Sequence, residues 1–413
     1  MISFVWSSKY PFTAGSGGSE TYTAGQIREL HRRGIEARII TIGHGLNDGR
    51  DDFPDIPFLS LESKEELAEL DDLLVYVIYP LAVKTKHQPY AILHCPPPTF
   101  QHGDPLYKRE AFRDVRLITA SKFAAGIWRR YLKTNFSRMP TVYPYADVAF
   151  SQAQRTQGRR TGRPQVLFAG RLKNDKGIYT LLAAMFMEDK QEEPPFDLTV
   201  TTSGSNTAEG KVLLAMLRKN PYVTIAPAER EPKDMAALMA KHDIVVMPST
   251  AIFWQELFGM VSIETQHAGC RVVASRSGGL PETNLGGVVL VRPDDPKSLA
   301  NGIATAIAKG PLTARERRQA CNEFTIQNSV GSLLKAINYS GYLRKIERSA
   351  RASSADAMPA RIRRPRAGEA LSSLSMRNAA NRLRPRMSLK PAQAGSSHES
   401  KQPRGRADSL AKK

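Results

Sequence analysis

Residues 255–269, QELFGMVSIETQHAG, and residues 277–282, SGGLPE, are the most informative part of this chain. Glu256 and Glu264 are eight positions apart, about two helical turns, and the intervening LFG predicts that Glu256 precedes a helix that contains Glu264. A carboxylate only accepts hydrogen bonds and suits a sugar diol, while Gly259 lets N–H groups at a helix start approach a phosphate. Sugar and phosphate together indicate a nucleotide-sugar site. The two acids alone would also fit a solvated helix with two surface glutamates.

The composition is that of a globular protein. A length of 413 residues accommodates two domains and a tail, and 41% hydrophobic residues are ordinary for a soluble chain. The longest apolar stretch, LLVYVIYPLAV, is too short to span a membrane, and the N-terminus lacks the features of a signal peptide. We therefore expect a cytoplasmic protein. Cys95, Cys270 and Cys321 are too few and too scattered for a disulfide framework or a C-x-x-C site.

The net charge of +19 is concentrated near the C-terminus. Residues 344–413 contain 18 Lys and Arg against 5 Asp and Glu, about +13, which leaves about +6 on the rest of the chain. Residues 346–413 have little apolar surface to bury and are predicted to be a disordered basic tail. Such a tail can associate peripherally with the anionic inner face of a cell membrane, or it can be passively solvated. The absence of aromatic residues after Tyr342 argues against nucleic-acid binding.

Strand and helix patterns alternate through the first 340 residues and predict an α/β protein with parallel sheets covered by helices. The first set of elements spans residues 1–150, with a helix expected from Ser19 to Arg33 and a last strand at 140–148, PTVYPYADV. Residues 151–163 lack large apolar side chains and form the predicted linker. The pattern restarts over residues 164–325, which predicts a second domain of the same kind.

Three further segments favour the same type of ligand. SGGSE lies between the first strand and its helix, where Gly17 and Gly18 let the backbone face an anion. FAGRLKNDKG places Arg171 and Lys176 on a strand-to-helix loop, where two cations can face a diphosphate. His94 ends a predicted strand, where open α/β sheets bind ligands. Separately, these features would also fit an ordinary turn, solvated surface cations and a structural histidine.

Together these motifs resemble those of glycosyltransferase family 4, whose members are retaining glycosyl transferases of group 1. The shared elements are Gly-Gly-Ser-Glu near the start, GRLKNDKG, the E-x7-E spacing of ELFGMVSIE, and AGCRVVASRSGGLPE. The similarity spans residues 1–342. It implies the GT-B fold, in which two Rossmann-like domains with parallel sheets face a central cleft. It also implies a C-terminal helix at 326–345 that crosses back onto the first domain.

The resemblance also implies roles for individual residues. Arg171 and Lys176 would hold the diphosphate of a nucleotide-sugar donor. Glu256 would bind hydroxyls of the transferred sugar, and Glu264 would bind the ribose diol. His94 would line the reacting centre on the acceptor side. The other donor contacts would come from the backbone at the helix start and from two glycines of the first domain: Phe258, Gly259, Met260, Val261, Gly17 and Gly18.

The activity implied by the resemblance is transfer of a hexose from a UDP- or GDP-linked sugar to a hydroxyl acceptor, in cell-surface polysaccharide or glycolipid biosynthesis. No Asp-x-Asp metal site is evident in the sequence, so we expect cations to stabilise the diphosphate without a metal or other cofactor. Leu257 stands where the family usually has proline, and VYPYAD replaces an Asn-Gly turn, so the acceptor class is open. The alternatives are an epimerase or phosphorylase on the same fold, or a non-catalytic nucleotide-sugar or nucleic-acid-binding protein.

Overall fold

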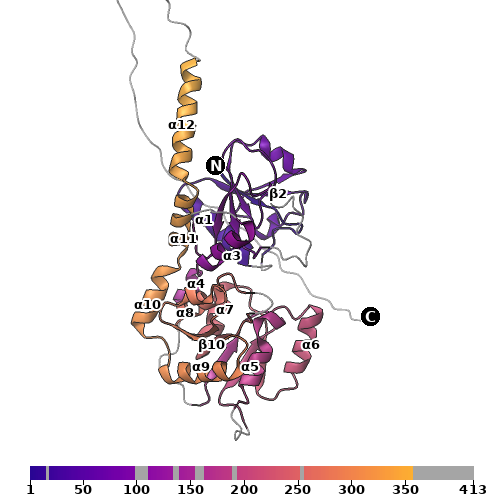
Figure 1. Cartoon of the computed structure of the whole chain (residues 1–413), viewed down its shortest axis with the longest axis vertical. Helices are drawn as coiled ribbons and strands as arrows, with labels where there is room; N and C mark the ends of the chain where they lie inside the picture. The colour runs from indigo at the N-terminus through magenta and orange to yellow at the C-terminus, as the bar shows by residue number, and fades with distance from the viewer. Residues whose placement is uncertain are drawn as a thin grey trace, which may run out of the picture. The chain divides into compact units, whose positions relative to one another are not determined.

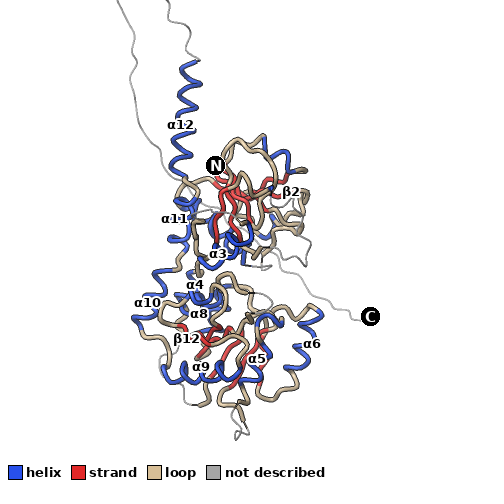
Figure 2. Tube along the Cα trace, viewed as in Figure 1, coloured by secondary structure: helices blue, strands red, loops and turns tan. Residues whose placement is uncertain are grey.

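The computed structural model describes residues 1–14, 18–97, 110–133, 139–153, 162–187, 193–251 and 255–356. These residues form two six-stranded parallel sheets accompanied by helices (Figure 2). The strand order is β3-β2-β1-β4-β5-β6 in the first sheet and β12-β11-β10-β7-β8-β9 in the second. Counted from the first strand of each half, both sheets have the doubly wound order 3-2-1-4-5-6 of the Rossmann fold. The predicted α/β class is confirmed.

Central strands of both sheets are buried along their whole length. The first sheet contains β1 (Ile2–Trp6), β2 (Ala37–Ile42), β3 (Phe58–Leu61), β4 (Leu73–Val77), β5 (Tyr90–Leu93) and β6 (Arg116–Thr119). The second sheet contains β7 (Gln165–Phe168), β8 (Asp197–Thr201), β9 (Val223–Ala226), β10 (Ile244–Met247), β11 (Arg271–Ser275) and β12 (Val288–Val291). Every residue of β1, β4 and β10 is buried. Parallel sheets are covered on both faces, which explains why these strands are nearly continuous apolar runs.

The helices are α1 (Gly18–Arg32), α3 (Lys122–Leu132), α4 (Val148–Gln152), α5 (Ile178–Ala184), α6 (Ala208–Leu217), α7 (Pro232–Ala240), α8 (Met260–His267), α9 (Pro296–Lys309), α10 (Ala314–Glu323), α11 (Ile326–Ala336) and α12 (Tyr339–Asp356). Some helices connect successive strands of a sheet, α4 lies between the two sheets in the sequence, and α9 to α12 follow the last strand. Helix α1 begins and ends one residue before the predicted Ser19–Arg33 helix. Its buried stripe includes Tyr22, Ile27 and Leu30, the apolar positions that repeat at helical spacing.

Helix α11 packs against the first sheet's helix layer. Val330 and Leu333 of α11 are fully buried in the same core as Leu30 of α1. The Gln26 side-chain amide of α1 also donates to the Ser329 hydroxyl of α11 at 3.2 Å. Helices α1 and α11 therefore lie side by side, although Gln26 and Ser329 are 303 positions apart in the sequence (Figure 1).

The strand predicted at 140–148 is wrong. In this segment only Thr141 forms a bridge, to Thr119 at the end of β6, and irregular backbone then continues to α4. Pro144 has no N–H group to donate to a sheet, which is a physical reason for the failure. Strand β3, which directly follows Pro57, was not predicted at all.

The C-terminal region also differs from the prediction. The single helix expected at 326–345 is two helices, α11 and α12, separated by Asn338 with a left-handed φ of 49°. Helix α12 continues to Asp356, so residues 346–356 are helical and not disordered. The rest of the predicted disordered tail, 357–413, lies outside the described residues, as do residues 154–161 of the predicted linker. Within the described part of the chain, no helix combines the length and the apolarity needed to cross a bilayer.

Candidate functional site

Lys176 and Glu256 make the central contact of the candidate site. Lys176 ends the 3-10 turn η4 (Asn174–Lys176) after β7, and Glu256 lies in the segment after β10. Strands β7 and β10 are hydrogen-bonded neighbours where the strand order of the second sheet reverses, and this places the loops that follow them side by side. The Lys176 ammonium donates to a Glu256 carboxylate oxygen, and the two side chains are only 13% and 19% exposed.

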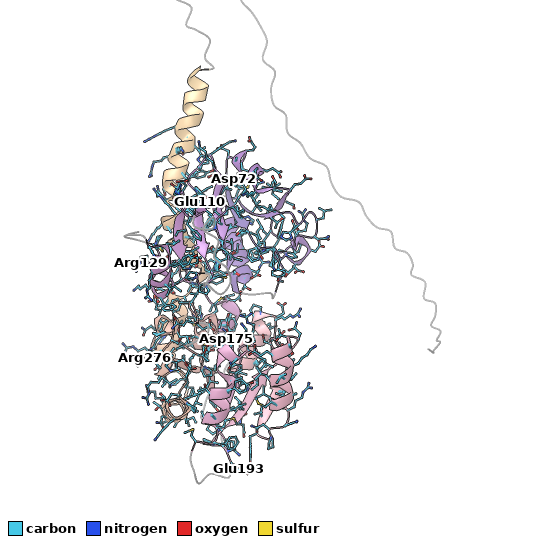
Figure 3. The ribbon with its side chains drawn as sticks, turned by 45° about the vertical axis from the view of Figure 1, so that its right-hand side comes forward. Asp72, Glu110, Arg129, Asp175, Glu193 and Arg276 are labelled. Carbon is cyan, nitrogen blue, oxygen red and sulfur yellow. The ribbon has the colours of Figure 1, made fainter. Side chains whose placement is uncertain are left out.

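The residues on either side of Lys176, Asp175 and Gly177, contact the segment that follows β10. Gly177 has a left-handed φ of 75°, and a Cβ at this position would lie 1.8 Å from the backbone oxygen of Pro248. Only glycine allows so close an approach. Asp175, labelled in Figure 3, is buried, and its backbone oxygen accepts a hydrogen bond from the Thr250 N–H at 3.0 Å. These contacts explain how Lys176 is held opposite Glu256.

Helix α8 starts at Met260, three residues after Leu257. Gly259, which the sequence predicted to open this helix to a phosphate, directly precedes it. Gly259 has a φ of 103° and precedes Met260, the first helical residue. The first N–H groups of a helix have no partner within it, so those near Met260 and Val261 can receive an anion. A Cβ on Gly18, the first residue of α1, would lie 3.2 Å from the Met260 sulfur. The starts of α1 and α8 are therefore adjacent, while Gly17 lies outside the described residues.

Glu264 lies inside α8, as the sequence predicts. Its side chain makes no hydrogen bond or ion pair within the described residues, and none joins it to the Lys176–Glu256 pair. Burial, and to a smaller extent the charge of Asp147, raises the pKa of Glu264 to about 7. Its carboxyl group is therefore poised to change charge near neutral pH.

His94 directly follows β5 and packs against a tyrosine of α1. The rings of His94 and Tyr22 are 4.7 Å apart in an edge-to-face arrangement. The His94 Nε2 atom is buried and has no hydrogen-bond partner among the described residues. Burial lowers the pKa of His94 to about 4, so the ring is neutral at physiological pH. A buried nitrogen without a partner is costly, and a bound ligand could satisfy it.

Arg171 is exposed on the loop after β7, five positions before Lys176. Its side chain forms no hydrogen bond or ion pair with any part of the chain that the structure describes. The Arg171 guanidinium is thus open to a ligand, but the structure does not bring it into contact with Glu256 or Glu264. No group of three or more His, Cys, Asp and Glu side chains is arranged to hold a metal ion among the described residues.

Glu282, the last residue of SGGLPE, has contacts that the sequence did not predict. It lies in the 3-10 turn η5 (Leu280–Thr283), and its carboxylate accepts a hydrogen bond from the Tyr143 hydroxyl at 2.8 Å. The Tyr143 ring also packs against Phe258, with centroids 5.5 Å apart. The Phe258 side chain is thereby buried, and only its backbone can face a ligand. The SGGLPE motif signalled the importance of this region, but the partners of Glu282 are about 140 residues away in the sequence.

Part of the chain is similar in sequence to a known protein family. Residues 163–309 match the family model of the glycosyl transferases group 1. The D-inositol 3-phosphate glycosyltransferase of Pseudarthrobacter chlorophenolicus is 34% identical over 176 residues, which is 40% of this chain and 40% of that protein. The match thus spans less than half the length of this curated relative, and it shows the similarity of one region.

Solved structures resemble the chain over a much larger part. A glycosyltransferase from Rickettsia africae has a TM-score of 0.63 at 17% identity, covering 82% of this chain and 98% of that one. Anabaena Alr3699/HepE in complex with UDP-glucose has a TM-score of 0.60 at 18% identity, covering 82% and 99%. These similarities, with the two Rossmann-type sheets, show the GT-B fold. Residues 163–309 thus resemble the glycosyl transferases group 1, in the half of the chain that contains most of the motifs similar to glycosyltransferase family 4.

Proposed function

We propose that this protein is a retaining hexosyltransferase that moves a sugar from a nucleotide-diphosphate donor to a hydroxyl acceptor. One observation carries the proposal: Lys176 and Glu256 meet at the switch point of the sheet that belongs to the family domain. A cation and a carboxylate at this point suit a ligand with both phosphates and hydroxyls. The UDP-glucose complex of the Anabaena neighbour supports a uridine diphosphate sugar as the first donor to test.

The ion pair has a specific part in this proposal. Without donor, Lys176 and Glu256 neutralise one another, so neither partly buried charge is left uncompensated. The donor diphosphate would take the ammonium of Lys176, assisted by Arg171. The freed Glu256 carboxylate would accept hydrogen bonds from the sugar hydroxyls. Donor binding thus exchanges one ion pair for two charge-assisted contacts.

In the transfer step the bond between the sugar carbon and the diphosphate oxygen breaks, and a bond from that carbon to the acceptor oxygen forms. The electron pair of the broken bond stays on the departing diphosphate oxygen, and that oxygen takes up the proton that the acceptor hydroxyl loses. Lys176 and Arg171 would stabilise the negative charge that grows there, without a metal or other cofactor. His94, neutral at physiological pH and with an unpaired buried Nε2, would face the reacting centre from the acceptor side.

Calorimetry with a panel of sugar nucleotides tests the donor assignment. We expect at least one of UDP-glucose, UDP-galactose and GDP-mannose to bind with a Kd of about 1 μM to 1 mM, the usual range for enzyme substrates. Product analysis with the bound donor should then show a new glycosidic bond. An isomerised or phosphorylated sugar as the only product would favour an epimerase or phosphorylase. The absence of binding by any sugar nucleotide would refute the donor site.

The acceptor would lie at a membrane surface, and the protein would be cytoplasmic and peripherally bound. The exposed cations Arg344, Lys345 and Arg348 on α12 support this, because they extend the basic character of the C-terminal region. We expect the full chain to sediment with phosphatidylglycerol vesicles at low salt and to be released at about 0.5 M salt, where charges are screened. Equal recovery with uncharged phosphatidylcholine vesicles would contradict an electrostatic membrane contact.

A further inference from the structure

We infer that Glu282 is a positioning residue, which fixes the backbone that carries Glu256 by joining turn η5 to the start of α3. This inference deepens the proposed function and rests on it for its catalytic consequence. Its structural part concerns only the contacts of Glu282 and stands independently. Glu282 has not been assigned a role by the motifs or by the ligand chemistry described above.

The Glu282 carboxylate caps a helix that is distant in sequence. Its Oε2 atom accepts a hydrogen bond from the Lys122 N–H at 2.9 Å, and its Oε1 atom accepts one from the Phe123 N–H at 2.7 Å. The Ser121 hydroxyl oxygen accepts a third, from the Ala124 N–H at 2.9 Å. The first three N–H groups of α3, which no helix can satisfy internally, are therefore all paired. The positive end of the helix dipole also favours a carboxylate at this place.

Tyr143 completes the binding of this carboxylate. Its hydroxyl donates to Glu282 Oε2 at 2.8 Å. Burial, together with this hydrogen bond, raises the pKa of Tyr143, so the hydroxyl keeps its proton at physiological pH and acts as a donor. Glu282 thus accepts three hydrogen bonds from two separate segments of the first domain. An amide at this position would present an NH2 group to N–H donors and could not reproduce the arrangement.

Residues next to Glu282 and next to the helix that it caps form hydrogen bonds with the backbone at Glu256 and Leu257. The Gly279 N–H donates to the Glu256 carbonyl at 2.8 Å, and the Ser121 hydroxyl donates to the Leu257 carbonyl. Glycine is required here, because a Cβ at Gly278 would lie 2.1 Å from the Glu256 oxygen and one at Gly279 would lie 2.1 Å from the Leu257 oxygen. The main chain at Glu256 and Leu257 is therefore held by η5 from one direction and by the start of α3 from another. Glu282 joins η5 to the start of α3 through its hydrogen bonds with the Lys122 and Phe123 N–H groups.

The consequence is a distinct kinetic signature. Glu256 has to meet the sugar hydroxyls with sub-ångström accuracy, and a displacement of about 1 Å can cost about 100-fold in rate. We expect Glu282→Gln to lower kcat about 10- to 100-fold while the donor KM changes less than about threefold, because Lys176 and α8 still bind the diphosphate. Glu282→Asp keeps the charge and should restore part of kcat.

Glu323→Gln is the matched control. Glu323 lines the same cavity of about 430 Å³ as Glu282 and Tyr143, but it is exposed, and its carboxylate makes no hydrogen bond among the described residues. The control should keep kcat within about twofold of wild type. A Glu282→Gln protein with wild-type kcat would overturn the catalytic consequence, and so would a decrease matched by an equal loss of donor binding.

Hydrogen exchange followed by mass spectrometry tests the structural part without any substrate. Glu282→Gln should increase exchange in peptides covering 121–124 and 255–262, while the melting temperature and the exchange of β1, β4 and β10 stay near wild type. Unchanged exchange at 255–262 would overturn the positioning role, whatever the kinetics show. If the wild-type protein binds no sugar nucleotide but the exchange result holds, only the proposed function fails.

Discussion

Replacement of Lys176 by alanine is expected to lower kcat for glycosyl transfer by about 10²- to 10³-fold. The leaving diphosphate gains negative charge as its bond to the sugar breaks, and Lys176 is the partly buried cation at the switch point of the second sheet. An ammonium that is largely shielded from water acts at a lower effective dielectric than a surface lysine, so its removal has a large effect. Steady-state kinetics with the donor found by calorimetry measures the change.

The protein should still fold with this replacement. Removal of Lys176 leaves the Glu256 carboxylate, which is 19% exposed, without its partner, so we expect the free energy of unfolding to decrease by about 1–3 kcal/mol in urea titrations. Lys211→Ala removes the same charge from an exposed position on α6 and should leave kcat within about twofold of wild type. Turnover at the wild-type rate in a folded Lys176→Ala protein would remove the main support for the proposed function.

Donor binding is expected to tighten about tenfold per pH unit from about pH 5 to pH 7 and to level off above that. The reason is the pKa of Glu264, which is raised to about 7, so the unliganded protein holds a proton there at lower pH. An ionised carboxylate accepts both hydroxyls of a ribose diol, and binding below pH 7 therefore has to release that proton. Calorimetry with a nucleoside diphosphate at several pH values measures the slope.

Glu264→Gln separates this effect from the titration of the ligand. The phosphate groups of the ligand titrate equally with both proteins, so the difference between their slopes reports Glu264 alone.

The Glu264 carboxyl group also affects the stability of the fold. Because its pKa is raised on folding, the wild-type protein loses stability as the pH rises from about 4.5 to about 7, and the loss is then constant. At pH 8 the variant should be more stable by about 1–3 kcal/mol, and at pH 4 the two should be equal. Identical slopes of ligand affinity against pH for the wild-type and Glu264→Gln proteins would exclude Glu264 from the ribose site.

Local patterns in the sequence predicted most elements of the fold. Helix α1 and strands such as β1 and β4 were evident because burial of one stripe or of both faces leaves a periodic or continuous apolar pattern. The segment 140–148 was misassigned because its apolar residues, including Tyr143, pack against other side chains and not within a sheet. Apolar content indicates burial, but it does not specify the partner.

The candidate site was predicted unevenly, for a similar reason. Residue type and position were enough to select Lys176 on a strand-to-helix loop, Glu256 before a helix and Glu264 inside that helix. The role of Glu282 could not be predicted, because a helix cap usually comes from the residue that precedes the helix, and Glu282 caps one about 160 positions away. Burial of His94 Nε2 and the raised pKa of Glu264 likewise depend on neighbours that only the folded chain supplies.

The sequence by itself determined the βα repetition, the two-domain organisation and the residue types of the candidate site, because these depend on short-range periodicity and on motif spacing. The tertiary structure alone decided that Lys176 meets Glu256. Their contact requires β7 and β10 to be neighbours although two strands intervene in the chain, and strand order follows from the packing of crossover helices over the whole sheet.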